Sequence, residues 1–174
     1  KEGDNKDLPE HNILSKMLKD GLTHIIKQRG GLIEANGRAH HFVFPSGKHS
    51  NKFLRTGNIL LHSSEIYFLA YHLLKYYQED EHQRILCDTS SINTIAFALL
   101  DLKRKFIGNS FNAVPVISFS PYDGIFSKKI KFFQNSLIIV SSSTSGNIIK
   151  KLIKHDGRID PLNIAILFFL GPLD

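Results

Sequence analysis

The sequence has one cysteine, no tryptophan and no long apolar run. Because Cys87 is the only thiol, an internal disulfide framework is excluded, and we expect a reducing, cytoplasmic environment. The longest apolar run, Leu162 to Leu170, contains Asn163 and is about half as long as a bilayer span requires. No basic segment followed by an apolar stretch opens the chain. We therefore expect neither a signal peptide nor a membrane partner.

The composition is that of a globular protein, since 42% of the 174 residues are apolar and 22% are charged. Disorder, collagen and low-complexity repeats are disfavoured by the same numbers, and the length fits one domain. We expect a loose lead-in over residues 1–11 and a single domain over residues 12–174. Within that domain, residues 12–60 form an N-terminal attachment and residues 61–174 form the core.

The formal net charge of +6 is a reason to consider a nucleic-acid partner. The sequence has no zinc-finger spacing, no aromatic RNA-binding signature and no convincing recognition helix. Nucleic acid stays open as a partner but is not favoured, because solvated lysines or a small phosphorylated ligand explain the charge as well. The basic residues form short clusters, which are Lys48, Lys52 and Arg55; Lys103, Arg104 and Lys105; Lys128, Lys129 and Lys131; and Lys150, Lys151, Lys154 and Arg158.

The first third of the chain predicts helices separated by short extended pieces. Helical spacing of apolar residues runs from Ile13 to Ile26, and two glycines follow it. Extended pieces over 31–35 and 40–44 flank an Asn-Gly turn signal, which predicts a hairpin. A second helix is expected over 65–78, with Ser64 as its N-cap.

The remaining two thirds alternate between strands and helices. Near-continuous apolar strands in such an alternation are typical of a parallel sheet that is covered on both faces. The fold class is therefore α/β, with an N-terminal α+β attachment. The expected strands cover 84–87, 113–119, 137–140 and 164–170, and the expected helices cover 92–103 and 147–155.

Ligands bind such sheets beyond the carboxyl ends of the strands, where loops lead into helices. Residues 88–91 and residues 141–147 are the two loops that occupy this position. The second offers backbone N–H groups at a helix start, several hydroxyls and a glycine, which suit a phosphate monoester. A serine-rich turn with an N-cap explains the same residues. The loop is not a P-loop, because the Lys of the Gly-Lys-Ser/Thr ending is absent. The candidate phosphate-binding residues are Ser143, Thr144, Ser145, Gly146 and Asn147.

Two stretches carry a resemblance to a known family. The segment Phe42 to Phe53, with its Ser-Gly-x-x-Ser turn, resembles the N-terminal segment of orotate phosphoribosyltransferases. The apolar run Leu137 to Val140, followed by Ser141 to Asn147, is similar to the phosphoribosyl-pyrophosphate (PRPP) motif of type I phosphoribosyltransferases. The resemblance covers roughly residues 12–170. It implies a phosphoribosyltransferase-like parallel sheet flanked by helices, an N-terminal hood-like attachment, and a homodimer.

The PRPP motif is degenerate in this chain. The family has two acids after the apolar strand, which hold the ribose hydroxyls of PRPP and help to position its magnesium. Ser141 and Ser142 stand at those positions here, and serine supplies no negative charge to a cation that prefers oxygen ligands. The loop is also about one residue shorter than the usual spacing. Asp88 or Asp123 from a neighbouring loop is left open as a replacement for the missing acids.

Other ligand elements of the family are altered as well. Its mobile catalytic loop carries lysines and a His-Gly pair, whereas the region between 119 and 137 has lysines and no histidine. The family's ligand-contacting lysine falls on His49, with Lys48 beside it. The glycine-rich pyrophosphate loop corresponds to residues 88–91, which lack glycine. The candidate ligand contacts outside the phosphate loop are Lys48, His49, Arg55, Asp88, Thr89, Ser90 and Ser91.

No metal-binding motif is present. The histidines His40, His41, His49 and His62 have no cysteine at zinc spacing, and neighbouring histidines on a strand point to opposite faces. Cys87 ends an apolar strand, which predicts a buried small residue and not a nucleophile.

Three functions remain open. The favoured one is a catalytically degenerate phosphoribosyltransferase-like domain that binds a nucleotide, PRPP or another phosphorylated small molecule as a sensing or assembly module, with no required cofactor. The second is an active, divergent orotate-type transferase that uses PRPP and magnesium. The third is a basic scaffold that binds nucleic acid or a protein partner.

Overall fold

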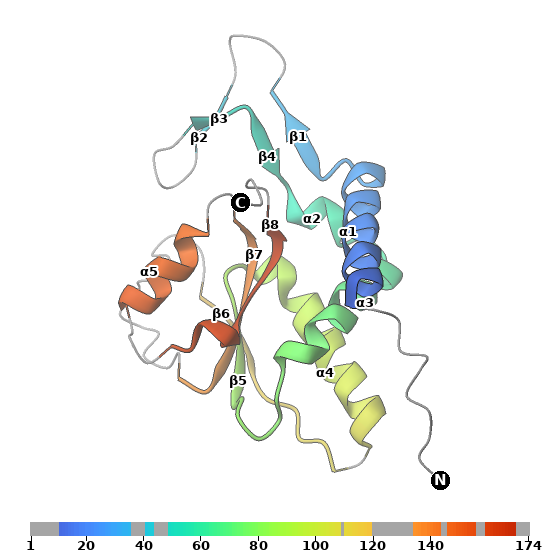
Figure 1. The fold of residues 1–174 in the computed structure, drawn as a ribbon, viewed down its shortest axis with the longest axis vertical. Coiled ribbons are helices and arrows are strands. Elements are labelled where there is room, and N and C mark those ends of the chain that lie inside the picture. The colour runs from blue at the N-terminus through green and yellow to red at the C-terminus, as the bar shows by residue number, and fades with distance from the viewer. Residues whose placement is uncertain are drawn as a thin grey trace. The chain divides into compact units, whose positions relative to one another are not determined.

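The computed structural model divides the chain into two compact units, Lys1–Phe53 and Leu54–Asp174 (Figure 1). The single domain expected over residues 12–174 stays a prediction. The structure describes residues 11–35, 41–43, 49–108, 110–119, 134–143, 146–155 and 159–169. Within these ranges, no helix is both long and apolar enough to cross a membrane.

The N-terminal unit begins with the predicted helix. Helix α1 spans His11–Gln28, and Gly30 follows two residues after its end with a φ of +57°, which favours glycine. The N–H groups of Arg29 and Gly31 donate to the carbonyls of Ile25 and Ile26, which closes the last turn. The unit's short strands are β1 (Leu32–Glu34), β2 (Phe42–Val43), β3 (His49–Ser50) and β4 (Lys52–Leu54).

The predicted hairpin between residues 31–35 and 40–44 is wrong in its pairing. β1 pairs with β4 and β2 pairs with β3, so neither extended piece has the other as its partner. Contacts with residues further along the chain hold this arrangement. Lys52 Nζ lies 2.8 Å from Glu34 Oε1, and the rings of Phe42 and Phe53 stack with centroids 5.3 Å apart. The Asn-Gly turn signal itself lies outside the described residues.

The second unit opens with helices. These are α2 (Thr56–Ile59), α3 (Ser63–Leu73) and the 3-10 turn η1 (Leu74–Tyr76). The helix predicted over 65–78 is therefore confirmed, but the predicted cap is wrong. His62 occupies the N-cap position without a side-chain hydrogen bond, and Ser64 lies inside the first turn. The helix starts before Ser64 because the Ile66 N–H already donates to the His62 carbonyl, at 3.1 Å.

A four-stranded parallel sheet follows, in the order β6-β5-β7-β8. Its parallel pairing confirms the predicted α/β class. The strands are β5 (Arg84–Cys87), β6 (Val116–Ser118), β7 (Ser136–Ser143) and β8 (Ile164–Phe169). The connecting helices are η2 (Ser90–Ile92), α4 (Asn93–Ile107), α5 (Asn147–His155) and η3 (Pro161–Asn163).

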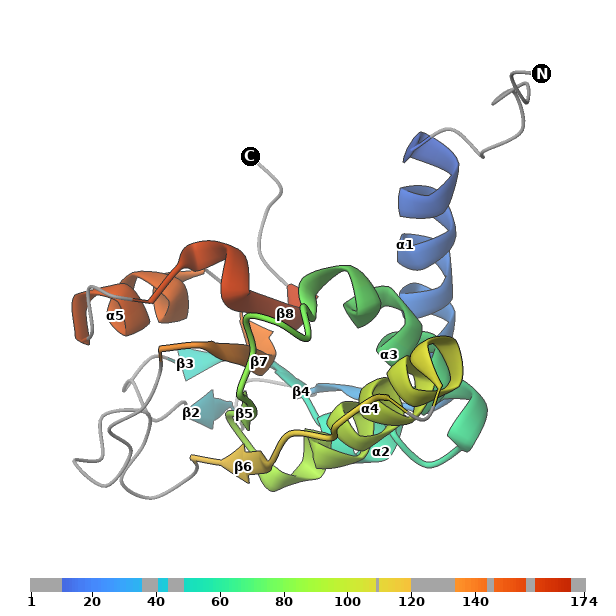
Figure 2. The same ribbon diagram turned by 90° about the horizontal axis from the view of Figure 1, so that it is seen from below.

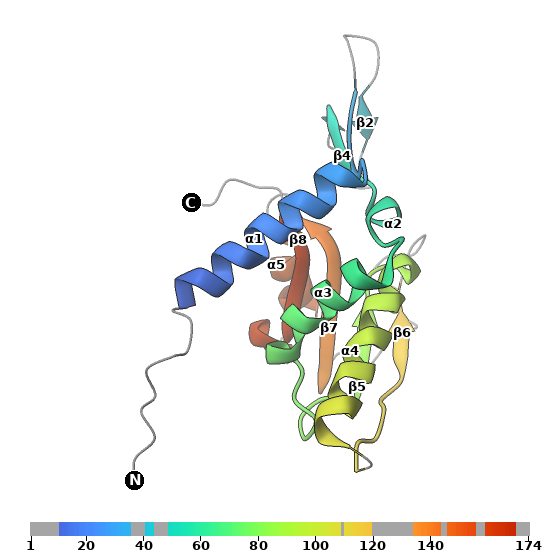
Figure 3. The ribbon, with the colours of Figure 1, turned by 90° about the vertical axis from the view of Figure 1, so that its right-hand side faces the viewer.

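Helices cover both faces of the sheet, as predicted. Helix α5 lies on one side of the sheet, and α3 and α4 lie on the other (Figures 2 and 3). On the α5 side, Leu152 joins a buried cluster with Leu86, Ile138 and Val140 of the central strands. On the other side, α4 buries its own apolar stripe, including Leu99. Burial on both faces explains why the strands are continuously apolar.

Two strand boundaries differ from the prediction. β6 covers only Val116–Ser118 of the expected 113–119. β7 extends past Val140 to Ser143, because Phe168 and Phe169 of β8 supply ladder partners for Ser142 and Ser143. The extension of β7 places Ser141, Ser142 and Ser143, which were expected in a loop, on a strand.

Candidate functional site

The candidate site lies at the carboxyl edge of the sheet, where β5 and β7 end beside each other. Asp88 follows β5 directly, and its N–H donates to the Ile139 carbonyl of β7 at 3.1 Å. β7 ends at Ser143, and α5 begins four residues later. Because parallel strands end at the same edge, the two predicted loops start from neighbouring points.

The expected loop over 141–147 is corrected by the structure. Ser141, Ser142 and Ser143 are half-buried strand residues, and only the stretch after them leads into the helix. Thr144 and Ser145 lie outside the described residues. Since side chains alternate along a strand, Ser141 and Ser143 share one face of β7, and Ser142 points to the other.

Ser143 fixes the turn that leads into α5. Its Oγ accepts a hydrogen bond from the Gly146 N–H at 3.0 Å, and the Gly146 carbonyl accepts from the Ile149 N–H in the first turn. This hydrogen bond closes the turn before the helix, whereas an N-cap side chain would accept from the second or third N–H of the helix itself. Gly146 has a φ of +65°, which L side chains rarely adopt, and Phe169 is the nearest side chain to the position of a Cβ there, at 4.0 Å. The turn thus brings a hydroxyl and a glycine to the start of α5, and the N–H groups in the first turn of any helix have no carbonyl partner within that helix.

Asp88 lies against Ser141, the first of the three serines at the end of β7. The Ser141 N–H donates to Asp88 Oδ1 at 2.9 Å, and the Ser141 hydroxyl donates to Asp88 Oδ2 at 2.8 Å. Burial raises the pKa of the Asp88 carboxyl, while the hydrogen bonds from Ser141 oppose that rise. The half-buried carboxylate that follows β5 is therefore held by the first serine at the end of β7.

The raised pKa of Asp88 predicts how stability depends on pH. The folded state binds the proton more tightly than the unfolded state, so the ionised carboxylate destabilises the fold above its folded-state pKa. This cost disappears as the pH falls through that pKa. Asp88→Asn keeps an acceptor for the Ser141 N–H and a donor for its hydroxyl. We expect the variant to have a higher melting temperature than the wild type at about pH 8. The increase should be roughly 2–4 °C for each kcal/mol by which the ionised Asp88 carboxylate destabilises the wild-type fold.

Thermal melts between about pH 8 and pH 4 measure this difference, which should shrink as the pH falls. Asp160→Asn is the matched control, because Asp160 is exposed and its Oδ1 accepts the Leu162 N–H at 2.8 Å. Asparagine caps as well as aspartate, so the control should melt like the wild type. A constant difference for Asp88→Asn across the pH range would contradict the expectation.

A group of hydroxyls adjoins the start of α4. Ser91 Oγ lies 3.3 Å from Thr89 Oγ1 and 3.4 Å from Thr56 Oγ1, so a residue of α2 joins the loop after β5. The Ser118 hydroxyl at the end of β6 donates to Asn93 Oδ1 at 2.8 Å. The sequence indicated Thr89 and Ser91 but missed Thr56, because no local pattern links residues 35 positions apart.

The other predicted contacts are distributed over the chain. His49 belongs to the N-terminal unit, where its ring stacks on His41 with centroids 4.5 Å apart. Arg55 is exposed just before α2, and Ser90 starts η2. Phe169, half-exposed beside Gly146, was also missed, since it reads as the end of an apolar strand. Several predicted positions lie outside the described residues, namely Lys48, Asp123, Lys128, Lys129 and Lys131.

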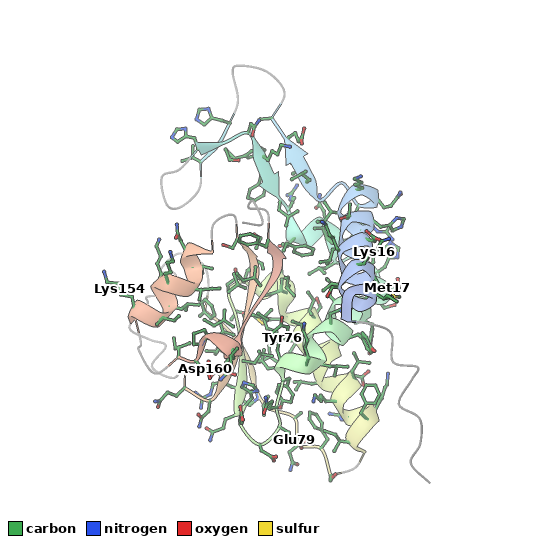
Figure 4. The ribbon with its side chains drawn as sticks, viewed as in Figure 1. Lys16, Met17, Tyr76, Glu79, Lys154 and Asp160 are labelled. Carbon is green, nitrogen blue, oxygen red and sulfur yellow. The ribbon has the colours of Figure 1, made fainter. Side chains whose placement is uncertain are left out.

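Two further side-chain predictions concern Cys87 and the basic face of α5. Cys87 is buried, as predicted, and burial together with the charge of Asp88 raises the pKa of its thiol to about 12. On α5, Lys150, Lys151 and Lys154 are exposed, and Lys154 points away from the sheet (Figure 4). In the described part of the chain, no three His, Cys, Asp or Glu side chains are grouped so that they could hold a metal ion.

The solved structures include chains with the same architecture. Orotate phosphoribosyltransferase from Aeropyrum pernix superposes with a TM-score of 0.56 over 86% of this chain and 94% of its own, at 15% sequence identity. The chain has a phosphoribosyltransferase-like fold. This confirms the fold that the sequence resemblance implied, and at this identity the similarity shows the fold alone.

Orotate phosphoribosyltransferase from Mycobacterium tuberculosis is more distant. Its complex with Fe(III) dicitrate gives a TM-score of 0.42 at 11% identity, covering 86% of this chain and 97% of its own. Its complex with inorganic phosphate gives 0.41 at 12% identity, covering 87% and 96%. No protein-family model and no curated protein matches the sequence.

Proposed function

We propose that this chain is a catalytically degenerate phosphoribosyltransferase-like domain that binds a phosphorylated small molecule, such as a nucleotide or PRPP, as a sensing or assembly module. The phosphate would lie beside Ser143 and Gly146 at the start of α5, a position that we call the phosphate cradle. One contact at the end of β7 supports this function.

That observation is the contact between Ser141 and Asp88. Both polar groups of Ser141, its N–H and its hydroxyl, donate to the Asp88 carboxylate. The first acid position of the motif therefore presents no charge of its own and is engaged in a contact within the protein. Two residues further on, Ser143 still orders the turn at Gly146. The charged half of the motif is replaced, whereas the phosphate half keeps its chemistry.

Phosphoribosyl transfer passes through a cation-like ribose while pyrophosphate leaves with its metal. Electrostatic stabilisation of such charge is usually the largest single contribution to enzymatic rate. Losing one such contact typically costs on the order of a hundredfold to a thousandfold in rate. An uncharged pair at positions 141 and 142 therefore favours binding without efficient turnover.

An active, divergent transferase is the second candidate, and Asp88 is the observation that favours it. Its carboxylate keeps one negative charge beside Ser141. The two functions differ in what they require. An active transferase releases pyrophosphate when PRPP and a base are both present, whereas the degenerate domain binds the phosphate compound and leaves it intact.

Gly146→Trp tests the phosphate cradle. A side chain at a φ of +65° costs about 1–3 kcal/mol of strain, and the indole would fill the space between the turn and Phe169. We expect the variant to lose binding of inorganic phosphate, as measured by isothermal titration calorimetry.

Gly30→Trp is the matched control. Gly30 also has a positive φ, +57°, but nothing lies within 4 Å of a Cβ there. It should therefore suffer similar strain and keep phosphate binding. Circular dichroism checks that both proteins are folded. If the folded wild type and Gly146→Trp bind phosphate equally, the phosphate does not bind at the cradle.

A further inference from the structure

The carboxylate of Asp88 lies close to the proposed phosphate cradle. Asp88 is fixed against Ser141, and Ser143 forms the cradle's first hydrogen bond. These two serines are two residues apart on one strand, which corresponds to about 7 Å between their backbones. A phosphate in the cradle would therefore sit within the range at which two half-buried charges interact.

The groups that act on the Asp88 carboxyl come from three segments. β7 contributes the Ser141 hydroxyl and N–H, and the start of the following loop contributes the N–H groups of Asp88 and Thr89. β5 places the thiol of Cys87 beside Asp88, and the charge of Asp88 helps to raise the pKa of that thiol. None of these groups is a cation. Among the described residues named here, no positive charge therefore neutralises the Asp88 carboxylate.

We propose that Asp88 couples anion binding in the cradle to uptake of a proton, so that the site binds phosphate with Asp88 protonated and disfavours it with Asp88 ionised. This inference rests on the proposed phosphate site and adds its regulation. The carboxyl is the side chain that changes charge, and the hydroxyl of Ser141 holds it in place in either state.

The coupling works in both directions. A bound anion raises the affinity of Asp88 for a proton, and a proton on Asp88 raises the affinity of the cradle for the anion by the same factor. Two unit charges about 7 Å apart in partly solvated protein interact strongly enough for an effect on the order of tenfold. The raised pKa of Asp88 places its titration closer to neutral pH than that of an exposed aspartate.

The test is calorimetric titration of the whole chain with inorganic phosphate, at several values between about pH 5 and pH 8, without divalent cations. Comparing Asp88→Asn with the wild type at each pH cancels the titration of phosphate itself. We expect the variant to bind about tenfold more tightly than the wild type at pH 8, and the two affinities to converge toward pH 5. Titrations in two buffers of different ionisation enthalpy should show proton uptake by the wild type that the variant lacks.

Asp160→Asn controls for net charge, because it removes the same charge at an exposed position and should match the wild type. If Asp88→Asn and the wild type bind phosphate equally at pH 8, the coupling is overturned and the phosphate site stands. If neither protein binds phosphate at any pH, the proposed function fails and the coupling fails with it.

Discussion

Replacing Ser141 with aspartate is expected to lower the free energy of unfolding by about 2–3 kcal/mol. The substitution removes the hydroxyl that donates to Asp88 Oδ2 at 2.8 Å and places a second carboxylate against a half-buried one. Two adjacent carboxylates cannot both stay ionised without cost. For a chain of this length the melting temperature should fall by roughly 4–12 °C, as measured by differential scanning calorimetry at neutral pH.

Ser142→Asp is the matched control. Ser142 alternates to the other face of β7 and pairs with Phe168, so its variant should stay within about 1 kcal/mol of the wild type. Adding Asp88→Asn to Ser141→Asp should restore most of the lost stability, because the double variant again holds one carboxylate and one donor. If Ser141→Asp melts like Ser142→Asp, the contact between Asp88 and Ser141 does not determine this part of the site.

The second large effect concerns catalysis. With PRPP, magnesium and a panel of nitrogenous bases, we expect pyrophosphate release at least about ten-thousandfold below the rate of an efficient transferase. The estimate assigns about a hundredfold to each of the two lost acids. A coupled assay for pyrophosphate measures the rate, and a working orotate phosphoribosyltransferase in the same assay provides the reference.

Dependence on the base is the decisive part of that assay. Slow pyrophosphate release that is the same with and without a base is hydrolysis and agrees with a degenerate site. Base-dependent release at a rate typical of enzymes, on the order of 1 per second or faster, would contradict the proposal and assign Asp88 the role of the missing acids.

Much of the fold could be predicted from the sequence, because local patterns determine it. Apolar strands that are buried on both faces read as uninterrupted runs, which is why the strand over 84–87 was predicted with its observed bounds. Apolar spacing from Ile13 to Ile26 predicted the helix that spans His11–Gln28, and the helix expected over 147–155 has its observed bounds. The alternation of strands and helices along the chain then indicated the α/β class.

The features that were not predicted depend on contacts between distant parts of the chain. β7 continues through Ser143 because β8 pairs with it, although three serines in a row suggest a loop. β1 pairs with β4 and not with β2, the extended piece that follows the Asn-Gly turn signal in the sequence. In both places tertiary partners override local propensity.

The contact between Asp88 and Ser141 also depends on pairing between distant parts of the chain. Asp88 and Ser141 are 53 positions apart, and the sequence offered Asp88 only as one of two alternatives for the missing acids. Parallel pairing of β5 with β7 brings them together. A known strand order would have made Asp88 the preferred alternative, since it follows the strand next to β7.

Calorimetric titration with PRPP, with and without magnesium, tests the central claim most directly. The account predicts binding that magnesium does not enhance, because the phosphate cradle needs no metal and both oxygens of Asp88 are engaged by Ser141. Magnesium requires several oxygen ligands. Binding that appears only with magnesium would contradict the account and indicate a working transferase site, and no binding at millimolar PRPP would contradict the phosphate cradle itself.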